Sequence, residues 1–69
     1  MISKMDLRNA IKVLKEHYDE NKKYVQDNKH ILNDEVIELI LIEGESCDRI
    51  AQLLEKGIEL FESITHRIN

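Results

Sequence analysis

The apolar positions of this 69-residue chain follow two helical patterns, with a short polar stretch between them. In the first half they recur at spacings of three, four or seven, which places them along one face of a helix. This stripe contains Leu7, Ile11, Leu14, Tyr18 and Val25, and Ala10, Val13 and Tyr24 widen it. Ser3 or Asp6 is suited to cap the first turn by accepting hydrogen bonds from free backbone amides. The pattern predicts a helix over about residues 3–28.

The second pattern begins with a clear signal for a helix start. Asn33 is a favoured N-cap residue, and Asp34 and Glu35 place negative charge at the positive end of the helix dipole. Downstream, one long apolar stripe contains Val36, Ile40, Cys47, Ile50, Leu54, Phe61, Ile64 and Ile68. These positions predict a helix over about residues 33–67.

The stretch 43–46 leaves the course of the second helix open. A glycine inside a helix costs roughly 1 kcal/mol relative to alanine, so Gly44 is a possible break. Ser46 would then cap a third helix. Because Cys47, Ile50 and Leu54 stay in phase with the residues before Gly44, we favour a continuous or kinked helix. A strand over residues 36–42 is a weaker alternative, since no second strand is available to pair with it.

The run Val36–Ile42 implies a partner surface, because six of its seven residues are apolar. A helix wraps such a run around its whole circumference, and one neighbouring helix covers only one flank. The predicted fold is therefore all-α: two long antiparallel helices form a hairpin, and two hairpins pair into a four-helix bundle homodimer. Its expected core contains Leu14, Ile40, Cys47, Ile50, Leu54 and Phe61. The alternative is a monomeric three-helix bundle broken at Gly44.

Composition supports a single helical domain over residues 1–69 that self-associates. The chain has no proline and two glycines, and a chain this short buries only about 60% of its unfolded surface. Small scaffolds are often reinforced by disulfides, a metal or a partner subunit. Cys47 is the only cysteine, and no Cys or His spacing is typical of a zinc site. The lone cysteine, the absence of an export signal and the shortness of the apolar runs favour a cytoplasmic protein that does not contact a membrane.

Charge is divided unevenly between the two predicted helices. Residues 1–30 hold seven basic and five acidic residues, whereas residues 31–69 hold three basic and nine acidic ones. A basic face of the first helix contains Lys4, Arg8, Lys12, Lys15 and Lys22. In a dimer this face would occur twice and could follow a phosphate backbone. We favour the simpler interpretation, in which the face is solvated and complements the acidic second helix, because Asp19 interrupts it and it carries no aromatic residue for base stacking.

An acidic surface of the second helix is the other candidate binding site. It contains Glu45, Asp48, Glu55, Glu59 and Glu62, with Glu38 before it. Such a surface suits a basic protein partner. The sequence thus predicts a small, non-enzymatic regulatory protein that acts through protein–protein binding as a helical homodimer. Nucleic-acid binding through the basic face is the alternative.

Residues with catalytic or metal-binding chemistry are few. In a hairpin that turns near residue 30, position 17 falls near position 44, which brings His17 within a turn of Cys47. A thiol beside an imidazole is an activated nucleophile when it is partly exposed, but a cysteine in an apolar stripe is more often a small buried hydrophobe. Glu62 and His66 share a helix face, as metal ligands sometimes do, although a cation near a helix C-terminus needs no metal to explain it. We therefore expect no catalytic residue, no cofactor and no metal.

Overall fold

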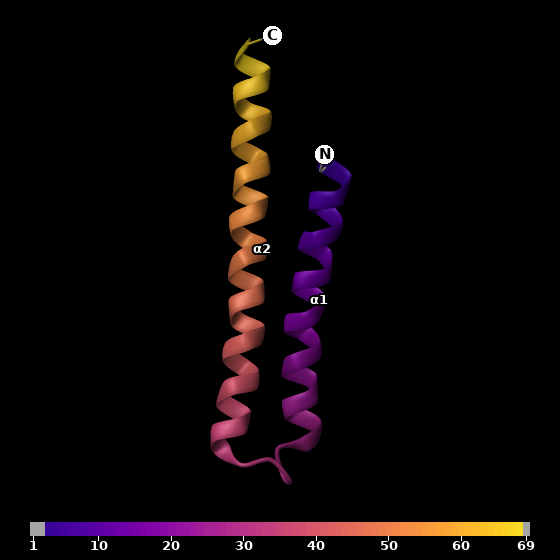
Figure 1. Cartoon of the computed structure of the whole chain (residues 1–69), viewed down its shortest axis with the longest axis vertical. Helices are drawn as coiled ribbons and strands as arrows, with labels where there is room; N and C mark the ends of the chain where they lie inside the picture. The colour runs from indigo at the N-terminus through magenta and orange to yellow at the C-terminus, as the bar shows by residue number, and fades with distance from the viewer. Residues whose placement is uncertain (1–2, 69) are drawn as a thin grey trace.

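The protein is a helical hairpin. The computed structural model describes the backbone of residues 3–68 and the side chains of residues 3–65. Helix α1 spans Lys4–Asn28, helix α2 spans Asp34–Ile68, and the two run antiparallel and side by side (Figure 1). The molecule is elongated, measuring 57 × 18 × 16 Å. Both helices begin and end within about one residue of the predicted bounds, so the two-helix prediction is confirmed.

Local capping sets where each helix starts. The Ser3 hydroxyl accepts a hydrogen bond from the Asp6 amide at 3.1 Å, and the Asp6 carboxylate accepts one from the Ser3 amide at 3.1 Å. This reciprocal capping box satisfies two free backbone donors, and the Ser3 amide lowers the pKa of Asp6 below its ordinary value. At α2, the Asn33 side chain accepts a hydrogen bond from the Val36 amide at 2.9 Å. The predicted caps are confirmed, and Ser3 and Asp6 act together.

Helix α2 runs through Gly44 without a break. The Ser46 hydroxyl does not cap a new helix; it donates a hydrogen bond to the Ile42 carbonyl at 2.8 Å, one turn back. The alternatives with a break over residues 43–46, and the three-helix bundle that depends on it, are therefore wrong for this chain. The strand alternative for residues 36–42 is also wrong, because this run lies within the first three turns of α2.

A close approach of the two helices explains why a glycine occupies position 44. Gly44 is buried against α1, and a Cβ atom there would lie 3.1 Å from Cδ1 of Tyr18 and 3.2 Å from Cβ of Asn21. The Asn21 amide also donates a hydrogen bond to the Ile40 carbonyl at 3.0 Å. The conformational cost of the glycine is thus offset by packing and by a side-chain bond that joins the helices.

The contact between the helices follows a seven-residue spacing on α2. Ile37, Gly44, Ala51 and Ile58 lie on the face of α2 toward α1, where Ala51 is fully buried. The facing residues of α1 are the predicted stripe, Leu7, Ile11, Leu14, Tyr18 and Val25. Of the core expected for the dimer, Leu14, Ile40, Cys47 and Leu54 are half-buried within the single hairpin, whereas Ile50 and Phe61 remain 49% and 69% exposed. The small residues at 44 and 51 bring their own edge of α2 closest to α1.

We predict that Gly44→Val destabilises the hairpin. The branched side chain has no room beside Tyr18 and Asn21, and overpacking of this kind costs about 1–3 kcal/mol. Glu45→Val, one residue further on an exposed position, is the matched control and should change the free energy of unfolding by less than about 0.5 kcal/mol. Urea unfolding followed by circular dichroism measures both. Equal stability of the two variants would contradict the close approach.

Candidate protein-binding face

Helix α2 carries an apolar surface that α1 does not cover. We define the outer stripe as the exposed apolar residues Leu39, Ile42, Ile50, Leu53, Leu60, Phe61 and Ile64. Leu39 and Leu53 are 67% and 65% exposed. The apolar arc of α2 is wider than the contact with a single helix, so one part of it packs on α1 and the rest faces solvent. Scattered exposed leucines are ordinary, but an aligned series along one helix is a candidate interaction surface.

One edge of α1 borders the outer stripe and extends it. His17 Nε2 contacts the Glu43 carboxylate, which places this edge of α1 beside the edge of α2 that carries Glu43. Ile50 lies two turns further along α2 on the same side as Glu43. Val13 and Tyr24 lie on the same edge of α1 and are 62% and 52% exposed. The hairpin therefore has an apolar side formed by both helices, with the His17–Glu43 pair as a polar group within it.

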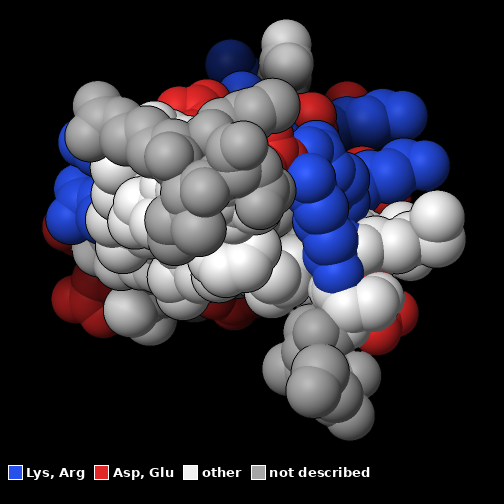
Figure 2. All heavy atoms as spheres, turned by 90° about the horizontal axis from the view of Figure 1, so that it is seen from above, with Lys and Arg blue, Asp and Glu red and all other residues white. Residues whose placement is uncertain are grey.

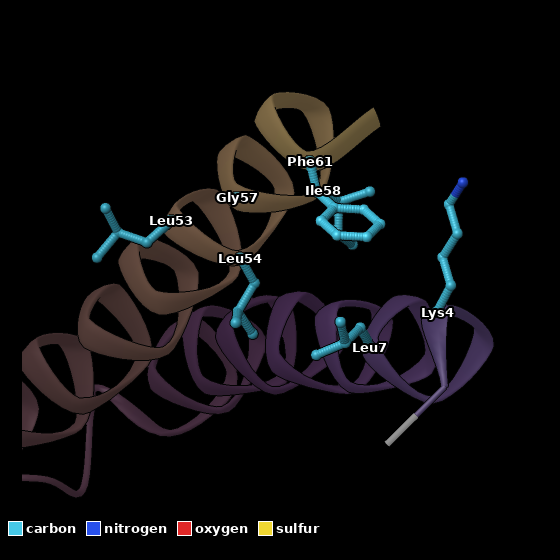
Figure 3. A pocket seen from close by; sticks show the side chains of 7 residues that line it. All are labelled: Lys4, Leu7, Leu53, Leu54, Gly57, Ile58 and Phe61. Atoms are coloured by element: carbon cyan, nitrogen blue, oxygen red, sulfur yellow. The ribbon is translucent and has the colours of Figure 1, made fainter. Parts of the chain in front are cut away.

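A groove opens in the apolar side near the start of α1. It has a volume of about 400 Å³ and is lined by Lys4, Leu7, Leu53, Leu54, Gly57, Ile58 and Phe61 (Figure 3). Leu54 points toward α1, while Leu53 points away from it. Gly57 forms part of the groove wall, and a Cβ atom added there would meet no atom within 4 Å. Packing against α1 therefore does not explain this second glycine.

The exposed area shows how much surface the hairpin leaves uncovered. A compact folded monomer of 8.2 kDa has an accessible area of about 4,500 Å² by the usual scaling with mass. The hairpin has 5,902 Å². The hairpin is elongated, so it exposes roughly 1,400 Å² more surface than a compact monomer of its mass.

The predicted basic face lies on the side of the hairpin opposite the apolar side. Acidic side chains form ion pairs with most of its basic residues. Lys4 and Arg8 pair with Glu62 at 2.5 Å and 3.1 Å, and Lys15 pairs with Glu55 at 2.5 Å. The remaining two bases have acidic neighbours on α1 itself, Lys12 with Glu16 at 3.9 Å and Lys22 with Asp19 at 3.6 Å. In the end view of Figure 2, basic side chains over α1 are interspersed with acidic ones.

These pairs perturb the pKa values of the groups involved. A hydrogen bond from Lys4, helped by its charge and by Arg8, lowers the pKa of Glu62 below its ordinary value. A hydrogen bond to Glu55 raises the pKa of Lys15. Both shifts favour the charged forms, so the basic face and the acidic helix complement each other within the hairpin.

Some residues of the predicted acidic surface form contacts within the hairpin, and others have no ion-pair partner among the described side chains. Glu55 and Glu62 pair with bases of α1, and Asp48 accepts a hydrogen bond from the Gln52 amide at 2.7 Å. Glu45 and Glu59 are exposed and have no ion-pair partner among the described side chains. Ion pairs within the described part of the chain therefore do not neutralise these two carboxylates. We call the side of the hairpin that carries them and the ion pairs its charged side.

The predicted neighbourhood of His17 and residue 44 is confirmed, but His17 contacts Glu43 and forms no hydrogen bond with Cys47 within the described residues. The side chain of His66, which shares a helix face with Glu62 in the sequence analysis, lies outside the described residues. Across residues 3–65, no three His, Cys, Asp or Glu side chains are grouped as metal ligands. Neither helix, over its described length, is long and apolar enough to cross a membrane.

Three residues that shape this face were not among the sequence-based candidates: Asn21, Gly44 in its packing role, and Gly57. The seven-residue spacing of Ile37, Gly44, Ala51 and Ile58 was the available signal for the close approach. No family model matches the chain, and no curated protein or solved structure matches it either.

The Glu62 pairing predicts a specific titration behaviour. Its folded-state pKa lies below the ordinary 4.5, so the pair stabilises the hairpin above that value and this stabilisation is lost as the pH falls through the lowered pKa. NMR titration of the Glu62 carboxyl group should show an upward shift of the pKa in Lys4→Gln. Lys56→Gln, which removes an equal charge from an unrelated position, should leave it unchanged. Equal responses would mean that Lys4 is not the cause.

Proposed function

We propose that this chain is a non-enzymatic interaction protein that pairs through its apolar side into a four-helix bundle homodimer and binds another protein through its charged side. The observation that carries this proposal is the uncovered outer stripe of α2, which runs nearly the length of the helix. Pairing two hairpins would bury this stripe and the exposed edge of α1 together. It would leave the ion-paired side, on the far side of each hairpin, facing solvent.

The charged side offers a specific surface to a second protein. Glu45 and Glu59 present carboxylates without intramolecular ion pairs among the described side chains, so a basic partner can approach them without first breaking a contact. Charged groups of this kind speed association and select partners more than they add affinity. We place this activity in the cytoplasm, where the unpaired Cys47 would remain reduced.

Leu53→Glu tests the homodimer. The wild-type chain is expected to show a mass near twice 8.2 kDa by light scattering at micromolar concentration. A charge at position 53 would have to be desolvated at the interface, so the variant should shift toward the monomer while keeping its helical circular dichroism.

Ser63→Glu is the control, since it adds the same charge to an exposed position on the polar face of α2. It should leave the dimer intact. A wild-type chain that remains a monomer over a wide concentration range would contradict the proposal, as would equal loss of dimer in both variants.

Nucleic-acid binding through Lys4, Arg8, Lys12, Lys15 and Lys22 is the alternative function. Such binding would require existing ion pairs to break, because Lys4, Arg8 and Lys15 would have to leave Glu62 or Glu55 to reach phosphates. We therefore expect any duplex DNA binding at low salt to be weak and unchanged by Lys12→Glu combined with Lys15→Glu, as measured by fluorescence anisotropy. Binding that falls steeply with salt and disappears in the double variant would establish the alternative instead.

A further inference from the structure

We infer that protons regulate the homodimer proposed above, through the pair that His17 and Glu43 form on the apolar side of the hairpin. The inference rests on the proposed homodimer and adds a condition for its formation. A second copy that covers the apolar side takes the pair out of water, and the pair is then most stable when it holds one proton. Pairing of two hairpins therefore takes up protons and is stronger at pH 6 than at pH 8.

The pair lies between apolar residues of both helices. His17 Nε2 contacts the Glu43 carboxylate across the two helices, and the side chains are 41% and 62% exposed in the single hairpin. Exposed apolar residues lie within two turns of the pair along each helix: Val13 and Tyr24 on α1, and Leu39 and Ile50 on α2. A partner that covers these apolar residues on both helices therefore covers the pair as well.

His17 is the group of this cluster whose charge changes between pH 6 and pH 8. On α1, Glu20 lies exposed one turn after His17, next to the Tyr24 hydroxyl edge, and Glu16 lies beside His17 with Lys12 at 3.9 Å. On α2, the half-buried Cys47 thiol lies one turn after Glu43. Carboxyl, phenol, amine and thiol groups titrate mainly outside this pH range, whereas an imidazole titrates within it.

Covering the pair changes the free energy of each protonation state by a different amount. When His17 is neutral, the pair carries one uncompensated negative charge, and the removal of such a charge from water is costly. When the pair holds one proton, the imidazolium and the carboxylate compensate each other and remain in contact, so the cost is smaller. The dimer therefore binds more protons than two separate hairpins. By linkage, its dissociation constant falls as the pH falls through the titration range of an imidazole.

Sedimentation equilibrium at pH 6 and pH 8, at one ionic strength, tests the inference. We expect the Kd of the wild-type dimer to be at least about tenfold higher at pH 8, because each of the two chains gains part of a proton on pairing. In His17→Gln no imidazole titrates at this place, so the Kd should be the same at both pH values. In Glu43→Gln a protonated His17 would be unpaired at the interface, so the Kd should be no higher at pH 8 than at pH 6.

His30→Gln is the matched control, because it removes an exposed histidine in the turn between the helices and should keep the wild-type pH dependence. Circular dichroism checks that every variant keeps its helices at both pH values. A wild-type dimer with the same Kd at both pH values would overturn the inference and leave the homodimer intact. The same holds for a tenfold dependence that persists in His17→Gln or Glu43→Gln, or that disappears in His30→Gln. A wild-type chain that is monomeric at both pH values would instead overturn the homodimer itself.

Discussion

The close approach of the helices at Gly44 determines the rest of this structure. A helix with an apolar arc as wide as that of α2 has several edges that could face α1. Gly44 and Ala51 select one of them, because small residues let the backbone of α1 come near and let Tyr18 and Asn21 cover the helix surface. Once this edge is used, Ile50 and Phe61 point elsewhere. The uncovered stripe is therefore a consequence of how the two helices pack, not of poor folding.

The rotation of α2 that packs Gly44 and Ala51 against α1 also places charged and apolar residues on different sides of the hairpin. With Gly44 and Ala51 against α1, Glu55 and Glu62 fall on the flank that meets Lys15, Lys4 and Arg8. These exposed pairs contribute little to stability individually, but they join the two helices along one flank, from the middle of α1 to its start. The flank at His17 and Glu43 is different, since apolar residues surround it on both helices. One side of the hairpin is thus suited to solvent and charged partners, and the other to apolar association.

Features with local physical causes were predicted from the sequence, and features that depend on relative rotation were not. The helix ends follow from the Ser3 and Asn33 caps, which need only neighbouring residues. Continuity through Gly44 followed from the phase of the apolar residues. The edge of α2 that faces α1 was not specified, because the stripe through Ile50 and Phe61 and the edge through Gly44 and Ala51 are nearly equally apolar in the sequence. Only the space available beside Tyr18 and Asn21 distinguishes them.

The two glycines of α2 together show how one helix can serve two contacts. Each weakens the isolated helix, so each is expected to be offset by packing elsewhere. For Gly44 the compensating contact lies within the chain, at Tyr18 and Asn21. For Gly57 no such contact exists in the hairpin, although the residue lies in the wall of an apolar groove. One glycine of α2 thus packs against the neighbouring helix and the other borders open space, and the homodimer proposed above would supply a second neighbour there, along the outer stripe.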